Sequence, residues 1–140
     1  MKLWGYCLTL CYAGLMDFEH GKAVVSHFND CINARDIEGL SRAMTDDHVF
    51  IDAADNRASG KPDCLRAWQG FFAAFPDYRN HFAQFAAKQE LIVVAGRSSC
   101  SDRRLDGPAL WTARVRGDRV SEWRVLEDNA SNRHVLGLHD

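Results

Sequence analysis

Apolar residues recur at helical spacing in the first half of the chain, which predicts three helices. Residues 17–35 carry one apolar stripe, formed by Val24, Val25, Phe28, Cys31 and Ile32. A second, short helix is expected over residues 36–44 with Asp36 as its N-cap, because its inner face repeats at the same period. Pro62 suits the first turn of a third helix, whose stripe is Leu65, Trp68, Phe72 and Phe75.

Alternating positions predict strands in the rest of the chain. The segment from His48 to Asp52 alternates, with His48, Phe50 and Asp52 on one face, and residues 55–60 are expected to form a loop. Further strands are expected over 79–87, 90–101, 109–117 and 119–127, with tight turns at Asp106-Gly107 and Gly117-Asp118. Helices followed by a meander of strands predict an α+β fold, with helices on one face of a curved antiparallel sheet.

Length and composition favour one globular domain. The 140 residues are 46% hydrophobic and 26% charged, which excludes disordered and fibrous classes. A net charge of −2 gives no reason to expect a nucleic-acid partner. Five cysteines without a framework spacing favour free thiols in a reducing compartment, so a cytoplasmic location is expected.

The N-terminal segment stands apart from this domain, which is expected over residues 16–140. Residues 3–16 are apolar and follow Lys2, but 14 residues are too few to span a bilayer, and no membrane association is expected. Residues 1–15 have three interpretations: an extension upstream of a natural start at Met16, a signal sequence, or an arm that covers an interface.

Motif searches exclude several chemistries. The sequence has no glycine-rich phosphate loop and no nucleophile elbow. Its six histidines show no metal-binding spacing. Neither a metal nor a cofactor is therefore expected, and chemistry without a cofactor, or binding alone, remains. Asp52 is the informative carboxylate, because it follows the apolar run Val49–Ile51. It either turns to water at the strand end or lies in an apolar cavity, where it could act as a general base.

The order and spacing of several segments resemble a known family. Residues 23–40 and 46–52 look like the opening of ketosteroid isomerases and SnoaL-like polyketide cyclases, of the nuclear-transport-factor-two-like superfamily. Residues 59–60, 71–77 and 120–128 resemble the same family, so the likeness covers about residues 17–138. It implies a cone-shaped sheet wrapped around three helices, an apolar pocket for a small hydrophobic molecule, and a homodimer through the outer sheet face.

The resemblance implies catalytic roles only in part. Asp52 matches the general base of the isomerases, but Phe28 stands where they have an oxyanion tyrosine, which disfavours steroid isomerisation. The protonated acid of the isomerases falls near Trp111 or Thr112. Asp128 matches the acid/base aspartate of the cyclases. Strict alternation instead places Asp128 on the strand face that points away from Trp123. There it would be an exposed acid at the strand end or a cap for residues 130–136.

Six further residues are candidates for substrate contact, and three functions remain open. Tyr78 and His81 are expected near the pocket mouth, and Phe28, Trp68, Phe72 and Trp111 are expected as pocket lining or core. The leading hypothesis is an acid/base isomerase, cyclase or dehydratase acting on an apolar ring compound, with Asp52 and Asp128 as catalytic residues. The alternatives are a pocket protein without turnover and an interaction module that uses its exposed sheet face.

Overall fold

Two helices, two strands and a third helix precede the four longer strands, and a short helix follows them. The computed structural model describes residues 2–138, with side chains described from residue 17. The helices are α1 (Lys2–Ala34), α2 (Ile37–Ala43), α3 (Lys61–Ala74) and α4 (Ala130–Val135). The strands are β1 (Met44–Ile51), β2 (Arg57–Ser59), β3 (Arg79–Lys88), β4 (Leu91–Ser99), β5 (Gly107–Arg116) and β6 (Arg119–Glu127).

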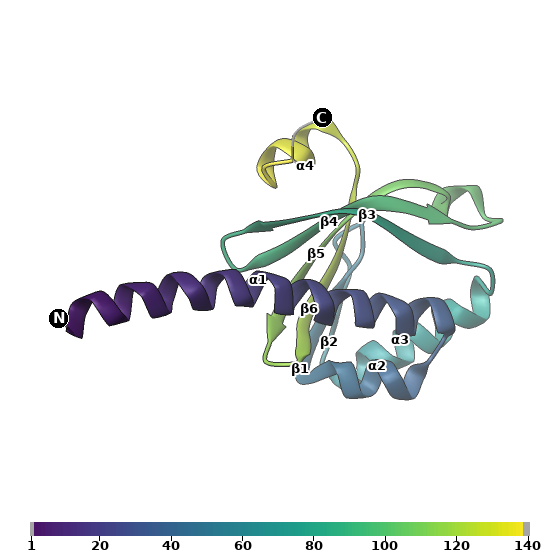
Figure 1. The fold of residues 1–140 in the computed structure, drawn as a ribbon. Coiled ribbons are helices and arrows are strands. Elements are labelled where there is room, and N and C mark those ends of the chain that lie inside the picture. The colour runs from purple at the N-terminus through teal and green to yellow at the C-terminus, as the bar shows by residue number, and fades with distance from the viewer. Residues whose placement is uncertain (1, 139–140) are drawn as a thin grey trace.

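One six-stranded sheet organises the molecule. Its strand order is β2-β1-β6-β5-β4-β3, so the earliest strands lie beside the last one. Helices α1, α2 and α3 lie on one face of the curved sheet and α4 lies on the other (Figure 1). The α+β class is confirmed, but the sheet is mixed rather than wholly antiparallel, because β1 and β6 pair in parallel. No hairpin links these two strands, so neither turn geometry nor local pattern fixes their relative direction.

Local signals account for most element boundaries. The Asp36 side chain accepts a hydrogen bond from the Gly39 amide, which caps α2 as expected. Helix α3 carries Pro62 in its first turn and ends before Pro76. Strand β1 begins at Met44, four residues earlier than expected, and β2 forms inside the expected 55–60 loop.

The two expected tight turns have different outcomes. Residues 117–118 form the turn between β5 and β6, as predicted. The link between β4 and β5 is longer than a hairpin turn and contains a 3-10 helix, η1 (Arg103–Leu105). Gly107 has φ +137°, a backbone conformation that favours glycine, and it begins β5 instead of closing a tight turn.

Helix α1 continues without a break through residue 16, where the sequence suggested a boundary. Its first half projects beyond the sheet, and its second half runs along the concave face (Figure 1). In the part of the chain that the structure describes, none of the helices has the length and apolar character that spanning a bilayer requires.

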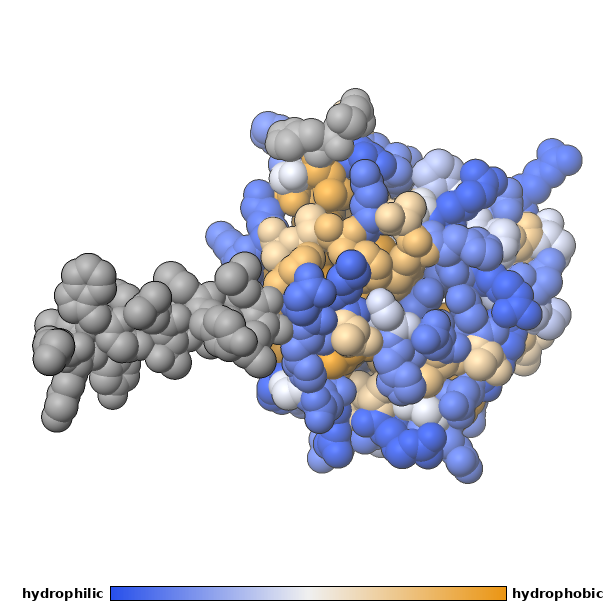
Figure 2. Space-filling model, viewed as in Figure 1, coloured by the Kyte–Doolittle hydropathy of each residue, from blue (hydrophilic) through white to orange (hydrophobic). Residues whose placement is uncertain are grey.

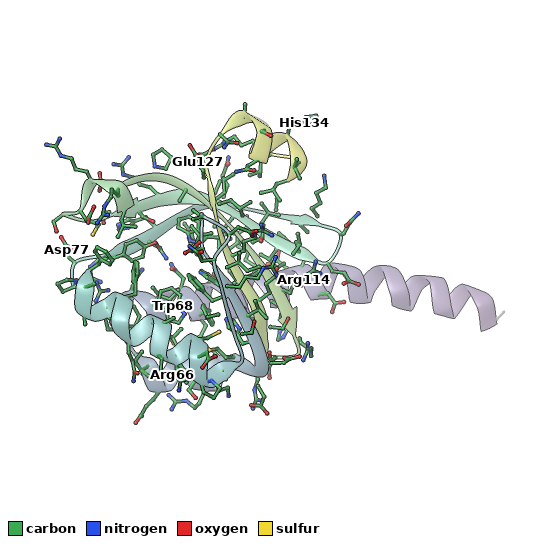
Figure 3. The ribbon with its side chains drawn as sticks, turned by 180° about the vertical axis from the view of Figure 1, so that it is seen from behind. Arg66, Trp68, Asp77, Arg114, Glu127 and His134 are labelled. Carbon is green, nitrogen blue, oxygen red and sulfur yellow. The ribbon has the colours of Figure 1, made fainter. Side chains whose placement is uncertain are left out.

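Aromatic side chains from every layer meet between the helices and the sheet. Phe28 of α1 stacks on Trp123 of β6 with ring centroids 4.6 Å apart, and Phe82 of β3 lies 4.9 Å from Trp111 of β5. Trp68 lies between α3 and the sheet, whereas Arg66 points away on the other side of the helix (Figure 3). Burial of these large rings is the main source of stability for this arrangement.

The outer face of the sheet carries a second, smaller apolar cluster. Val93, Ala95 and Leu110 pack there beneath Leu136, which follows α4. Figure 2, in the view of Figure 1, shows apolar surface next to α4, in the region of this cluster. Because α4 covers part of the outer face, less of it is left for a second copy of the chain. The expected homodimer stays a prediction.

Candidate functional site at the open end of the concave face

On β1 and β6, the inward-facing side chains become less buried toward one edge of the concave face, whereas on β5 both Ala109 and Val115, at opposite ends, are half-buried. On β1 the side chain of His48 is fully buried, whereas Phe50 and Asp52 are half-buried. On β6, Trp123 is fully buried and Val125 is half-buried. Phe50 pairs with Trp123 across the parallel ladder, so the exposed ends of both strands lie at the same edge. Inward-facing side chains are therefore half-buried at this edge, which is called the open end below.

The other elements around this opening are also apolar. On β5 Ala109 is half-buried and Trp111 is buried, which repeats the change seen on β1 and β6. From α3, Trp68 lies edge-on to Phe50 at 5.2 Å, and Phe71 is half-buried beside it. Apolar side chains from four elements thus border the opening, an arrangement typical of a site for an apolar small molecule.

Asp52 lies at the rim of this opening, held by its own loop. Its Oδ1 atom accepts hydrogen bonds from the amides of Ala54 and Asn56, both at 2.9 Å. Its Oδ2 atom accepts a third bond from the Asn56 side chain at 3.1 Å. Of the two positions that the sequence left open for this carboxylate, the structure shows the one at the strand end and not an enclosed apolar cavity.

Asp128 lies on the other side of the sheet. Its carboxylate accepts two hydrogen bonds from the Arg133 guanidinium, at 2.5 and 2.9 Å, and this pairing holds the pKa of Asp128 below its usual range. Leu126, on the same face of β6, packs in the cluster with Leu136. Alternation along the strand predicted that Asp128 lies on the face away from Trp123, and the structure agrees. The structure does not bring the two predicted catalytic aspartates into one site.

The six predicted contact residues divide into two groups. Five are buried in the core cluster on the concave side: Phe28, Trp68, Phe72, Tyr78 and Trp111. His81 is exposed and lies within hydrogen-bonding distance of the Ser99 hydroxyl, 3.2 Å away. Its neighbour Asn80 is buried on the concave side, so the alternation of β3 turns His81 outward, away from the opening. The expected substrate contact of His81 stays a prediction, and the register of β3 gives it no support.

A buried chain of polar side chains was not predicted. The Tyr78 hydroxyl lies 3.0 Å from the Ser98 hydroxyl, which donates to Asn80 Oδ1. Asn80 in turn donates to Asn29 Oδ1 of α1 at 3.2 Å. Burial raises the pKa of Tyr78, so its hydroxyl stays protonated. Because the members satisfy one another, this chain ties α1 to β3 and β4 and offers little to a ligand.

His48 is the second interior feature that the sequence analysis missed as a site residue. Its Nδ1 atom lies 2.6 Å from the carbonyl oxygen of Val120, and its ring stacks on Phe28 with centroids 5.6 Å apart. Its Nε2 atom is buried and has no hydrogen-bond partner among the described residues. The indole N–H groups of Trp68, Trp111 and Trp123 are also buried and unpartnered within that part of the chain. Alternation along β1 correctly predicted that His48 shares a face with Phe50. Its complete burial depends on packing against distant segments, so the local sequence does not predict it.

A separate groove lies at the other end of the sheet, where α1 leaves the body. It has a volume of about 770 Å³ and is lined by residues from α1, the β3–β4 hairpin, β5 and β6, among them Phe18, Ile92 and Val115. None of the predicted site residues lines it. In the described part of the chain, no group of three or more His, Cys, Asp or Glu side chains is placed to hold a metal ion.

Solved structures share this architecture at low sequence identity. A proposed polyketide cyclase from Sinorhizobium meliloti superposes with a TM-score of 0.67 at 17% identity, covering 74% of this chain and 93% of its own. A proposed ketosteroid isomerase from Kribbella flavida has a TM-score of 0.66 at 19% identity, covering 80% of each chain. An LEH-like epoxide hydrolase from M. tuberculosis has a TM-score of 0.66 at 14% identity, covering 79% of this chain and 84% of its own.

At these identities the superpositions establish the fold and leave the activity open. No curated protein matches the sequence. The SnoaL-like domain family matches residues 25–123, which run from the middle of α1 to the buried Trp123 of β6. This stretch includes the concave face and Asp52. The chain belongs to the SnoaL-like domain family.

Proposed function

We propose that the protein binds an apolar, ring-containing small molecule at the open end of its concave face. The observation that carries this proposal is the lower burial of inward-facing side chains of β1, β5 and β6 at one edge, where the half-buried positions are apolar or aromatic. The solved relatives are described as a cyclase, an isomerase and an epoxide hydrolase, all activities on small organic molecules.

Binding without turnover is favoured over a catalytic mechanism that uses both Asp52 and Asp128. The two-acid hypothesis needs Asp52 and Asp128 to face one molecule, and the sheet separates them. Asp52 alone lies at the opening, and its carboxylate already accepts three hydrogen bonds. A single carboxylate at the rim, beside aromatic walls, fits recognition of a mainly apolar ligand.

The test is binding of 2-naphthol, a two-ring probe, followed by quenching of tryptophan fluorescence and by calorimetry. Val125→Arg places a charge at the half-buried edge of the core cluster, and we expect it to weaken binding at least tenfold. Val135→Arg is the matched control, because Val135 is 62% exposed on α4. Absence of binding to the unmodified protein, or equal binding to the Val125→Arg variant, would overturn the proposal.

Acid/base catalysis by Asp52 is the second candidate function, favoured by the place of this carboxylate at the rim. A carboxylate there can remove a proton from the carbon beside a ring ketone. The test is hydrogen–deuterium exchange of 2-tetralone in D2O, followed by NMR. Catalysis predicts exchange above the buffer rate that is lost in Asp52→Asn and kept in Asp55→Asn. Equal exchange in the two variants excludes Asp52 as the base.

A further inference from the structure

We propose that residues 2–16, the first half of α1, pair with the same segment of a second copy of the chain as two antiparallel helices. The groove where α1 leaves the body receives the end of the partner helix. This interface does not depend on the proposed binding function, and it uses a different surface from the outer face of the sheet. Of the three interpretations of residues 1–15, it selects the arm that covers an interface.

The sequence of this segment is apolar on every side of the helix. Between residues 2 and 16 the only charged residue is Lys2, and ten of the others are Leu, Met, Cys, Trp or Tyr. A helix that is apolar all round is ordinarily buried against other protein. The sheet that covers the second half of α1 does not extend along this first half, which projects beyond it (Figure 1). The segment therefore needs cover from outside its own chain.

One face of α1 continues from the body into the projecting half. In the body, Val25 and Phe28 on this face are fully buried, and a Cβ atom added to Gly21 would lie 2.9 Å from Ile92 Cδ1 of β4. Steps of three and four residues toward the N-terminus place four more positions on the same face: Gly14, Cys11, Cys7 and Trp4. The face that meets the sheet in the body thus has no sheet opposite it in the projecting half.

This face is complementary to itself when a second helix runs antiparallel to it. With the two helices centred on Thr9, Trp4 is level with Gly14 of the second copy, and Cys7 is level with Cys11 of the second copy. The same pairs recur when the two copies are exchanged, as a two-fold interface requires. The largest side chain of the face thus meets glycine, and the two small pairs between them let the helices approach closely.

The groove lies where the end of the partner helix arrives. It opens beside the same face of α1, because Phe18 and Ile92 both line it, and its volume is about 770 Å³. In the register centred on residue 9, Lys2 of the second copy is level with Met16, one residue from Asp17. Asp17 is exposed and lines the groove, so the one charge of the segment meets an opposite charge there. Such complementarity favours this direction and register over others.

The first experiment measures the mass of the full chain by light scattering after size-exclusion chromatography. We expect the mass of two chains. Gly14→Trp sets a second large side chain against the partner's Trp4, and it should weaken dimerisation at least tenfold. Gly5→Trp is the matched control, because residue 5 is nine positions from residue 14 and therefore on the opposite side of the helix. It should leave the dissociation constant within about threefold.

Cysteine cross-linking measures the direction of the two helices. With copper phenanthroline as catalyst, two thiols give up two protons and two electrons to dissolved oxygen, and a disulfide should join Cys7 of one copy to Cys11 of the other. Cys7→Ser and Cys11→Ser should each abolish the covalent dimer, because like residues are offset by about 6 Å along the axis in addition to the separation of the helices. A mixture of the two variants should restore it. Cys100→Ser, outside the segment, is the control and should cross-link like the unmodified chain.

Four outcomes would overturn the proposal. The first is a full chain with the mass of one chain. The second is a dimer that Gly14→Trp leaves unchanged, which would place the interface on another surface. The third is cross-linking that survives each single cysteine substitution, which would indicate parallel helices. The fourth is a monomer that binds phosphatidylcholine vesicles in a flotation assay, which would assign residues 2–16 to a lipid surface instead of a second copy.

Discussion

His48 Nδ1 lies 2.6 Å from the carbonyl oxygen of Val120, and this contact joins β1 to β6 where their pairing is irregular. Val120 is paired with Met44 on β1, and the register shifts before pairing resumes at Val49. A side-chain donor thus reaches a backbone acceptor at a point where the ladder is interrupted. The hydrogen bond requires a proton on Nδ1, which both the charged imidazole and one neutral form carry. Burial favours the neutral form.

The first prediction is that stability falls as the pH is lowered through the ordinary titration range of histidine. Burial lowers the pKa of His48 in the folded state, so below about pH 6.5 the unfolded chain binds a proton that the folded chain resists. The contribution is fully present above that pH and is lost as the pH falls. We expect the melting temperature to fall between pH 7.5 and 5, by less in His48→Phe.

The matched control for this titration is His81→Gln, because His81 is exposed on the outer side of β3. It should follow the unmodified protein across the same pH range. If the melting temperatures of His48→Phe and of the unmodified protein fall equally with pH, His48 is not the group that causes the pH dependence.

The second prediction concerns the loop that Asp52 holds. Asp52→Ala removes the acceptor for the Ala54 and Asn56 amides, so we expect a loss of about 1 kcal/mol in the free energy of unfolding. Asp52→Asn keeps one side-chain oxygen and should cost clearly less. Urea unfolding of both variants provides the measurement. A gain in stability on Asp52→Ala would contradict the structural role and favour a carboxylate kept for function at a cost.

The third prediction concerns the attachment of α4 to the sheet. The side chain of Asp128 is only 13% exposed and is paired with Arg133, which lowers its pKa. We expect Asp128→Asn to lower stability by about 1 kcal/mol and to speed amide exchange in residues 130–136. Because the pKa is lowered, the contribution is present above about pH 4 and is lost in acid. Asp30→Asn, an exposed change on α1, is the control, and equal exchange in both variants would contradict the pairing.

Elements defined by local signals were predictable from the sequence. Asp36 caps α2 through the Gly39 amide three residues away, and the stripe containing Phe28 faces the sheet as its period requires. Alternation alone placed Asp128 opposite Trp123, and the residues of β6 keep that alternation. In each case neighbours within a few residues along the chain supply the information.

Features that join distant segments were not predictable in the same way. The partner of His48 Nδ1 lies 72 residues farther along the chain, so no local pattern marks it. The Tyr78–Ser98 hydrogen bond depends on the pairing of β3 with β4. The parallel pairing of β1 with β6 requires the last strand of the meander to lie beside the first strand of the sheet. His81 shows the converse, since the family resemblance suggested the pocket mouth while the alternation of β3 turns it outward.

The last prediction tests the close approach of β3 and β4 at the bulge in their ladder. Their register shifts between Phe82 and Gln84, and a Cβ atom on Gly96, the partner of Phe82, would collide with the carbonyl oxygen of His81. Gly96→Ala therefore requires backbone movement, and we expect a loss of about 1–3 kcal/mol in the free energy of unfolding.

Gly70→Ala is the matched substitution, because Gly70 is exposed within α3 and a Cβ atom there meets nothing within 4 Å. Alanine is the better helix former, so this variant should gain about 0.5–1 kcal/mol. Urea unfolding of both variants measures the contrast, with opposite signs expected for the same chemical change. If Gly96→Ala is as well tolerated as Gly70→Ala, the backbones of β3 and β4 do not approach as closely as the bulge requires. The outward turn of His81, which follows from the same register, would then be in question.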